Sequence, residues 1–325
     1  QSAVRDGVTA EEVKGILLGM ASGQETLLGY FRRFIRNFEK RVGINRTVGS
    51  LRAYSNAYSH IERFLQAQYK LSDIPFSALD RSFIDKYDLY LRTERNLAPG
   101  TIINLTVQLK TIVGEAIADG IITASPFMGY EPVRPKHVQK YLTAEELHRI
   151  MTTPLHRQTL YHVRDMFLFS CFTGIPYGDM RLLTKDNLCL AEDGIWWIKS
   201  ARQKTKIEFE IPLLDLPLQI LKKYSGTAPG DKLLPMYCNS TLNLYLKEIA
   251  RICHIDRPLV FHAGRHTYAT EITLSHGVPL ETVSRMLGHS QIETTQIYAK
   301  VTDEKIDADT KALNRKISER FSVVI

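Results

Sequence analysis

Three short segments near the C-terminus carry residue types that suit phosphate chemistry. They are His262-Ala-Gly-Arg265, Leu-Gly-His289 and Thr-Thr-Gln-Ile-Tyr298. An arginine presents a planar fork of N–H donors that matches two phosphate oxygens. His262 precedes Arg265 by one helical turn, so both side chains can reach one phosphate. His289 follows a glycine that permits close approach and adds a donor, while the Tyr298 hydroxyl is a potential nucleophile. These segments predict a phosphate site beside a phenol.

The order and spacing of the three segments resemble the tyrosine recombinase (phage integrase) family, and most closely the integrases of Bacteroides mobile elements. That family carries H-x-x-R, then L-G-H, then a tyrosine nine residues after that histidine, and all three match here over a resemblance spanning residues 24 to 320. Each motif alone is common by chance, but their joint occurrence is not. The resemblance implies a site-specific DNA recombinase in which Tyr298 attacks a DNA phosphate. It also implies a 3′-phosphotyrosine intermediate, a Holliday junction, and integration or excision of a mobile element.

A covalent link explains why this chemistry uses a phenol. The link conserves the energy of the phosphodiester, so a 5′-hydroxyl from a partner strand can reverse the step. A phenol titrates near ~10, so cationic neighbours must help it ionise or a base must take its proton. His262 is the candidate base. No metal and no nucleotide cofactor are expected, because the sequence has neither a Walker A motif nor an acidic metal-binding cluster.

The leaving 5′-oxygen needs a proton, which family members supply from a lysine on a β-hairpin. By resemblance this residue is Lys204, and Lys206 is the alternative because it would share a strand face with Lys204.

One family arginine is missing. The family reads T-G-x-R with an acidic residue shortly after, whereas here Thr-Gly-Ile is followed by Pro176, with Asp179 at the acidic position. Either the enzyme is impaired or another arginine supplies the charge. Arg202 is the best substitute, because it lies two positions before Lys204 and both would point to one face of a strand. Arg181 is the second candidate. We expect Asp179 to orient a catalytic arginine or histidine.

The elements that position these residues fall into two domains. Apolar periodicity, caps and breakers predict helices over residues 10–20, 25–42, 48–69, 81–93 and 99–119. By resemblance to the family, the helices from residue 25 onward form an N-terminal helical core-binding (SAM-like) domain. Residues 1–22 are expected to be an N-terminal segment, the end of an absent arm-binding domain, and residues 23–127 the core-binding domain. Residues 128–141 are expected to form a basic linker, and residues 142–325 the catalytic domain.

The expected C-terminal domain is the α+β tyrosine recombinase catalytic domain. It begins at a capping motif, Thr143 with Glu146, and contains a buried helix over residues 155–173. Two strands, 194–200 and 206–212, flank a basic turn, and the chain is mostly helical after them. The whole chain is therefore expected to be mainly α with a small antiparallel β-sheet.

The charge balance favours a polyanionic partner. The net charge is +7 and the pI is near 9.1. Expected partners are double-stranded DNA at specific recombination sites, clamped between the domains, and further copies of the chain in a homo-tetramer on synapsed DNA. The apolar end of the tail would dock onto a neighbouring protomer, and an accessory DNA-bending protein is a further expected partner. Candidate DNA contacts are Thr101, Asn104 and Lys110 on the last helix of the first domain, and Lys140 in the linker.

The composition excludes several other classes. No run of eighteen apolar residues exists, so a membrane span is not expected, and the four cysteines form no C-x-x-C pair, so a zinc site is not expected. Disulfides are not expected in a chain of this size without a secretion signal. A cytoplasmic, nucleoid-associated bacterial protein is the resulting expectation. Two alternatives stay open: a type IB topoisomerase, and a non-enzymatic DNA-binding protein derived from a recombinase, which the arginine missing at Pro176 would suit.

Overall fold

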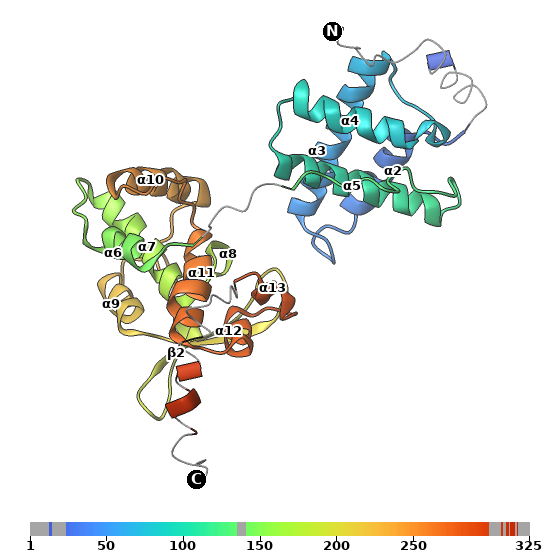
Figure 1. The fold of residues 1–325 in the computed structure, drawn as a ribbon. Helices are drawn as coiled ribbons and strands as arrows, with labels where there is room; N and C mark the ends of the chain where they lie inside the picture. Colours follow the sequence, from blue (N-terminus) through green and yellow to red (C-terminus); the bar gives the residue numbers. More distant parts are fainter. Residues whose placement is uncertain are drawn as a thin grey trace, which may run out of the picture. The chain divides into compact units, whose positions relative to one another are not determined.

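The computed structural model describes residues 24–134 and 141–298, together with isolated helical positions near both ends of the chain. The chain divides into two compact units, Gln1–His137 and Val138–Ile325, and each has a hydrophobic core of its own (Figure 1). No helix in the described part of the chain combines the length and apolarity that a bilayer span requires.

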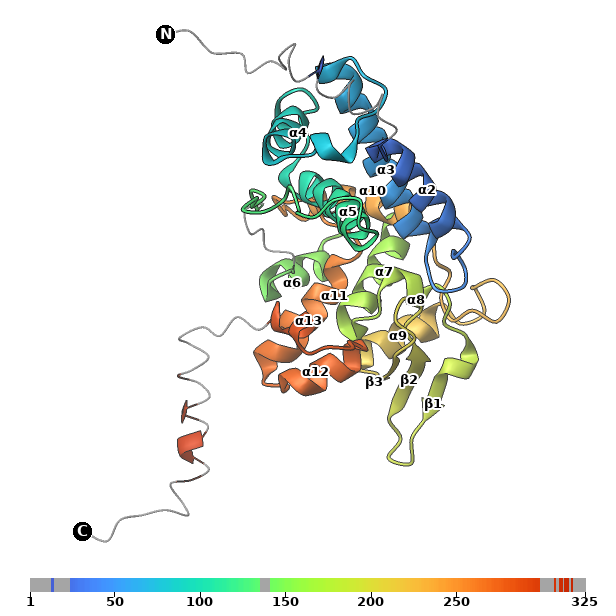
Figure 2. The same ribbon diagram turned by 90° about the vertical axis from the view of Figure 1, so that its right-hand side faces the viewer.

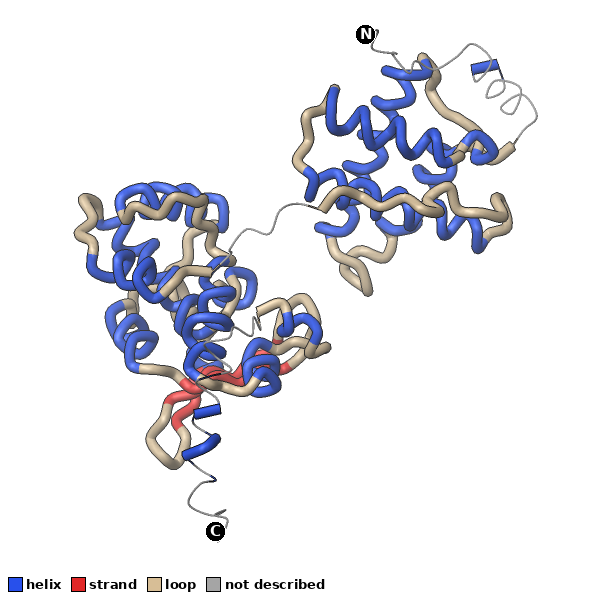
Figure 3. Tube along the Cα trace, viewed as in Figure 1, coloured by secondary structure: helices blue, strands red, loops and turns tan. Residues whose placement is uncertain are grey.

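The described part of the N-terminal unit is built from helices and the loops between them (Figure 3). Its helices are α2 (Leu27–Glu39), α3 (Val48–Phe64), the π-helical turn η1 (Leu65–Tyr69), the 3₁₀ turn η2 (Phe76–Ala78), α4 (Arg81–Thr93) and α5 (Pro99–Ala118). The predicted helix over residues 48–69 is α3 continued by η1, and the one predicted over 81–93 has those bounds. The prediction of an all-helical SAM-like unit is confirmed.

Local signals begin these helices. The Thr47 hydroxyl accepts the Ser50 N–H at 3.1 Å ahead of α3, and the Asp80 carboxylate accepts the Phe83 N–H at 2.7 Å ahead of α4. Pro99 occupies the first turn of α5, where its missing N–H costs nothing.

The core of this unit is aromatic and aliphatic. Phe64 contacts the rings of Tyr69, Phe83 and Tyr87, and all four residues are buried. Such ring pairs favour edge-to-face and tilted geometry. Helix α5 buries one mainly apolar stripe against this core, in which Thr106 is the polar member and donates its hydroxyl to the Ile102 carbonyl at 2.8 Å.

The C-terminal unit combines helices with one small sheet. Its elements are α6 (Ala144–Thr152), α7 (Gln158–Thr173), α8 (Tyr177–Met180), η3 (Lys185–Asn187), β1 (Leu188–Leu190), β2 (Trp196–Ala201), β3 (Glu208–Pro212), α9 (Asp215–Lys223), α10 (Asn239–Ile252), α11 (Ala263–Thr267), η4 (Tyr268–Thr273), η5 (Leu274–His276), α12 (Leu280–Leu287) and α13 (Glu293–Gln296).

Helix α7 is the central element of this unit. Its second half is buried almost throughout, and it packs against α9, α10 and α11 (Figure 1). A helix that is apolar on every side must be surrounded, which is why the composition of residues 155–173 predicts burial. Together with the sheet, α7 forms the support on which the later helices lie.

The sheet has three antiparallel strands in the order β1-β2-β3 (Figure 2). Ile198 pairs with Leu188 on one side and with Ile211 on the other, which places three apolar side chains on the core face. The predicted small antiparallel sheet is confirmed, but the sequence pattern missed β1. That strand is only three residues long and none of its side chains is fully buried, so it lacks a clear alternation.

The turn between β2 and β3 corrects one argument from the sequence. Strand β2 ends at Ala201, and residues 202–207 form the turn, in which Arg202 and Ile207 share a 2.8 Å backbone hydrogen bond. Lys206 has a φ of 60° and donates its N–H to the Arg202 carbonyl at 2.8 Å. Arg202 and Lys204 therefore do not share a face of a strand, because neither lies in one. The strand predicted from Lys206 begins instead at Glu208.

Three predictions fall outside the described residues: the helix over residues 10–20, the contact at Lys140, and the docking of the tail after Tyr298.

Candidate active site

Helix α11 supplies the central cation of the site. Arg265 is 3% exposed, and its guanidinium donates to the Gly174 carbonyl at 2.9 Å and to the Leu287 carbonyl at 2.6 Å. Gly264 lets α11 approach α7 closely, since a Cβ there would lie 2.9 Å from the Ser170 hydroxyl. The arginine is thus held at the junction of α7, α11 and α12 by two backbone oxygens.

Burial shifts the pKa of this arginine. Desolvation, followed by the neighbouring charge of Arg202, lowers the pKa of Arg265 to about 10, because both disfavour the cation. At neutral pH the group remains charged, and a buried cation whose described partners are neutral groups attracts an anion strongly.

Arg202 and Arg265 meet at the C-terminal end of α12. The Leu287 carbonyl, at the C-terminus of this helix, also accepts a hydrogen bond from Arg202 at 3.1 Å. Carbonyls at a helix C-terminus carry partial negative charge, which offsets the repulsion between two guanidiniums. Two features require glycine at position 288. Its φ is +64°, and a Cβ would lie 2.8 Å from Cγ of Arg202. The glycine of the L-G-H motif therefore makes room for an arginine as well as ending the helix.

Asp179 orients Arg202. A carboxylate oxygen lies 2.7 Å from Nε of Arg202, and the other oxygen accepts the Gln203 N–H at 2.9 Å. The carboxylate is 5% exposed. The Nε–H does not point at the nearer oxygen, so this contact is an ion pair rather than a linear hydrogen bond. The other candidate, Arg181, caps α8 and is exposed.

His289 is held at both ring nitrogens. Nε2 lies 2.9 Å from Nη2 of Arg265, and Nδ1 lies 2.7 Å from Oγ1 of Thr295. Arginine can only donate, so Nε2 accepts and Nδ1 carries the proton. Desolvation, with the charges of Arg265 and Arg202, lowers the pKa of His289 to about 4. The ring is therefore neutral at pH 7 and, in this arrangement, accepts a hydrogen bond where the sequence predicted a donor.

Tyr298 lies directly after α13 and is 8% exposed. Its ring stacks on His289 at a centroid distance of 6.4 Å and meets the edge of His266 at 5.2 Å. Burial raises the pKa of the phenol, while Arg265 and Arg202 oppose the rise by stabilising a phenolate. The structure thus places the phenol beside both guanidiniums.

Two predicted lysines lie in an exposed turn, and the predicted base His262 meets the cluster through the ring of His266. Lys204 is exposed in the turn between β2 and β3, as is its alternative Lys206. His262 is exposed just before α11, and its ring lies 4.9 Å from that of His266. Sequence reasoning missed His266, although its place four residues after His262 on a helix was the available signal.

The predicted DNA contacts of the N-terminal unit lie on α5. Thr101, Asn104 and Lys110 are all exposed. Lys110 lies nine positions after Thr101, which places their side chains roughly half a turn apart around the helix. These three side chains therefore do not form one strip on α5.

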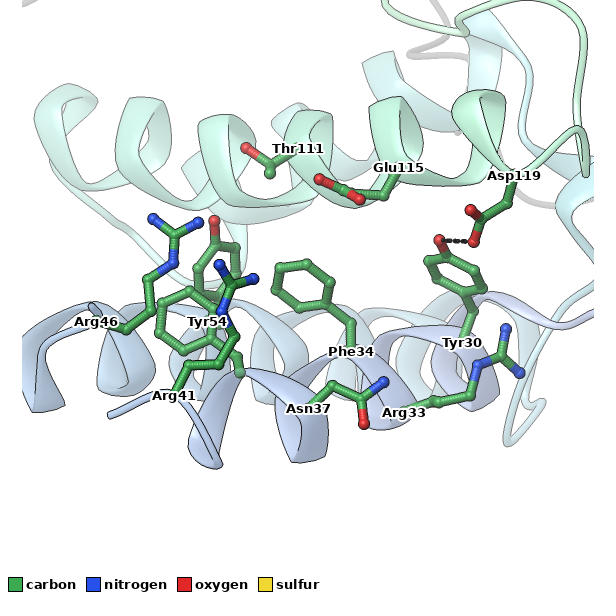
Figure 4. Close-up of a pocket in the computed structure, with 11 residues that line it drawn as sticks. Tyr30, Arg33, Phe34, Asn37, Arg41, Arg46, Tyr54, Thr111, Glu115 and Asp119 are labelled. Carbon is green, nitrogen blue, oxygen red and sulfur yellow. Dashed lines mark hydrogen bonds between the residues drawn. The ribbon is translucent and has the colours of Figure 1, made fainter. Parts of the chain in front are cut away.

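The N-terminal unit also has a groove of about 320 Å³ between α2 and α5 (Figure 4). Arg33 and Arg41 lie on the α2 side of the groove, and Glu115 and Asp119 lie on the α5 side, where Asp119 accepts the Tyr30 hydroxyl at 2.6 Å. Opposite charges on the two sides do not favour a phosphate, so this groove is a poor alternative to the arginine cluster.

The arginine cluster has the parts that phosphoryl transfer needs. Two guanidiniums converge on one carbonyl, and a neutral imidazole and a phenol lie beside them. Preorganised donors of this kind stabilise charge that develops on a phosphate during attack. Among the described residues, no group of three histidine, cysteine or acidic side chains is arranged to hold a metal ion.

Comparison with known proteins agrees with this chemistry. The model of the phage integrase family matches residues 140–305, and the phage integrase SAM-like domain matches residues 26–132. The chain is similar to the tyrosine recombinase XerD of Listeria monocytogenes, with 25% identity over 273 residues, covering 79% of this chain and 89% of the relative. XerD of Staphylococcus saprophyticus is 26% identical over 297 residues, covering 87% and 96%.

Two solved structures share the fold. The integrase of transposon Tn1549, in complex with transposon right end DNA, has a TM-score of 0.68 at 19% identity and covers 89% of this chain and 99% of its own. A lambda integrase dimer bound to a core site has a TM-score of 0.68 at 18% identity and covers 86% and 100%.

Proposed function

The chain belongs to the phage integrase family and is a tyrosine site-specific DNA recombinase, and from this premise we propose that Tyr298 is its nucleophile. The phenol oxygen attacks a DNA phosphorus, the P–O5′ bond breaks, and a 3′-phosphotyrosine remains. The observation that carries this assignment is the stacking of the Tyr298 ring on His289, whose Nε2 lies 2.9 Å from Nη2 of Arg265.

The scissile phosphate takes over donors that backbone oxygens now occupy. Arg265 and Arg202 both donate to the Leu287 carbonyl, so a phosphate oxygen placed there would receive both guanidiniums. A dianionic transition state binds such donors more tightly than a neutral carbonyl does, and each donor is worth about 100- to 1000-fold in rate.

Arg202 supplies the charge that is missing at Pro176. This assignment rests on its ion pair with Asp179 and on the carbonyl that it shares with Arg265. It no longer rests on a common strand face with Lys204.

Two proton transfers complete the reaction. We assign the phenol proton to His262, whose ring lies beside His266, which in turn contacts Tyr298. Lys204 protonates the leaving 5′-oxygen. Its place in an exposed turn lets it reach DNA that lies over the site.

The same premise supports a set of finer assignments. Strand exchange proceeds through a Holliday junction in a homo-tetramer on two synapsed sites, with an accessory DNA-bending protein as a further partner. Thr101, Asn104, Lys110 and Lys140 contact double-stranded DNA. A role in moving a mobile element is supported by the likeness to the Tn1549 integrase and the lambda integrase, both solved on DNA. The resemblance to integrases of Bacteroides mobile elements stays a prediction.

Covalent capture tests this proposal without knowledge of the target site. Full-length protein is incubated with nicked duplexes whose sequence around the nick is random, and adducts that survive denaturation are sequenced. We expect an adduct with the wild type and none with Tyr298→Phe. An adduct that persists in Tyr298→Phe would overturn the assignment.

The recovered duplex then tests the substitute arginine. Arg202→Ala should bind it nearly as tightly as the wild type yet form adduct at least about 100-fold more slowly. The matched control, Arg181→Ala, should react normally. Wild-type cleavage by Arg202→Ala would sink the assignment of Arg202.

Strand exchange between two marked duplexes separates the remaining alternatives. A type IB topoisomerase would relax supercoiled DNA without exchanging strands, and a DNA-binding protein without activity would form no adduct.

A further inference from the structure

Thr295 contacts both the histidine and the nucleophile of the site. It is fully buried on α13, and its hydroxyl oxygen lies 2.7 Å from Nδ1 of His289. Its backbone carbonyl accepts the Tyr298 N–H at 2.9 Å. One residue therefore sets the ring orientation of His289 and the start of the segment that carries the phenol.

We propose that Thr295 is a positioning residue that lets His289 change from acceptor to donor at Nε2 without gaining charge. The inference rests on the proposed role of Tyr298 and its phosphate site. In the structure Nε2 accepts from Arg265, so Nδ1 carries the proton and donates to the Thr295 hydroxyl. Which nitrogen of a histidine is protonated is set by the hydrogen bond that the other nitrogen makes.

When a phosphate binds, Nε2 of His289 must donate a hydrogen bond instead of accepting one. Once Arg265 turns its donors to the phosphate, Nε2 loses its donor partner and faces an oxyanion that requires an N–H. A hydroxyl both accepts and donates, so Thr295 can rotate and donate to Nδ1. One proton then leaves Nδ1 for solvent and one reaches Nε2, and the ring stays neutral.

A tautomer change that leaves His289 neutral matters because the charged imidazolium is disfavoured at this position. In the free chain, burial and the two neighbouring arginines hold the pKa of His289 at about 4, so the ring that meets the phosphate is neutral at the outset. A side chain that could only accept would fix His289 with its Nε2 lone pair facing the phosphate. A side chain with no polar atom would leave Nδ1 without a partner.

Substitution of Thr295 tests the proposal. Thr295→Ser keeps a hydroxyl and should cleave the captured nicked duplex within a few-fold of the wild type. Thr295→Val keeps the shape but not the hydroxyl and should cleave about 10- to 100-fold more slowly, with DNA affinity unchanged. The matched control, Thr294→Val, changes the exposed neighbouring threonine and should have no effect. A wild-type rate for Thr295→Val overturns the proposal.

A second variant separates positioning from general support of α13. In a His289→Gln background, Thr295→Val should add almost nothing, because the residue on which it acts is gone. An equal additional loss in that background would mean that Thr295 only supports the helix, and would also overturn the proposal.

Nitrogen-15 NMR of histidine-labelled full-length protein tests the resting state without DNA. His289, assigned by its absence from His289→Gln, should be protonated at Nδ1 in the wild type and in Thr295→Ser. Thr295→Val should keep the proton at Nδ1, because Arg265 still donates to Nε2, but this N–H loses its hydrogen-bond acceptor and its nitrogen resonance should shift. Protonation at Nε2 in the free wild type would contradict the proposal. The NMR measurement needs no DNA and gives a result even if no covalent adduct forms. Failure of the proposed function and failure of this inference therefore remain distinguishable.

Discussion

The two units of the chain bury different kinds of side chain. In the described part of the N-terminal unit the buried polar residues are His60 and Thr106, and its charged side chains are exposed or partly exposed. The C-terminal unit buries Arg265, Asp179 and Asp165, each with polar partners. Removing one member of a buried pair leaves the other uncompensated, whereas exposed pairs contribute about 0–1 kcal/mol.

This difference separates two tasks. A fixed set of buried donors costs stability but needs no reorganisation during reaction. A unit with surface charges keeps its core apolar and meets DNA through contacts that salt screens. Substitutions in the C-terminal unit should therefore change the chemistry, and those in the N-terminal unit should change affinity.

The largest effect should come from Arg265→Ala. It removes a buried donor to the phosphate and leaves the Gly174 and Leu287 carbonyls without it. We expect single-turnover cleavage of the captured duplex to fall about 1000-fold. Arg36→Ala, an exposed arginine of α2, should leave the rate of the saturated complex unchanged. Equal losses in the two variants would contradict the division between the units.

A smaller loss should follow Asp179→Asn. The substitution keeps the acceptor for Gln203 N–H but removes the charge that pairs with Arg202. Charge-assisted contacts of this kind are worth about 1.5–3 kcal/mol, so cleavage should slow by about 10- to 100-fold. Glu210→Gln breaks the exposed pair with Lys199 and is the control, with no expected change. A normal rate in Asp179→Asn would show that Arg202 is held without it.

The half-buried His289 should make the C-terminal unit sensitive to acid. The pKa of His289 is lowered from 6.5 to about 4 in the folded chain, so between these values the unfolded chain binds the extra proton. Stability is therefore lost as pH falls from about 6.5 toward 4. Thermal unfolding at pH 7 and pH 4.5 should show a smaller acid-induced decrease of the transition temperature in His289→Asn than in the wild type. The exposed His148→Asn should behave as the wild type, and an identical decrease in all three proteins would refute the assignment.

The smallest effects should come from α5. Lys110→Ala should weaken DNA binding a few-fold and reduce the slope of log affinity against log salt by about 0.9. Thr101→Ala and Asn104→Ala should change affinity less and leave that salt slope intact. Binding isotherms at several salt concentrations measure both quantities. A slower cleavage rate in the DNA-saturated complex of any of these variants would show that α5 contributes to the chemical step and not only to DNA binding.

Much of the helical architecture was predictable from local signals. The bounds of α4 follow from Asp80 as its cap and from an apolar stripe, and the burial of α7 follows from its composition. Strand β1 and the length of the turn after β2 were not predictable, because three half-buried residues and a positive φ at Lys206 leave no periodic pattern.

The sequence by itself determined the two-unit helical fold, the small sheet, the family, and the candidate residues that carry the chemistry, because order and spacing of motifs survive without coordinates. Only the tertiary structure decided which of them meet. It brought Arg202 to Arg265 through the Leu287 carbonyl, assigned the His289 proton to Nδ1, and left Lys204 in an exposed turn. The meeting of the two arginines and the tautomer of His289 depend on contacts between residues 22 to 85 positions apart, and no local pattern encodes such contacts.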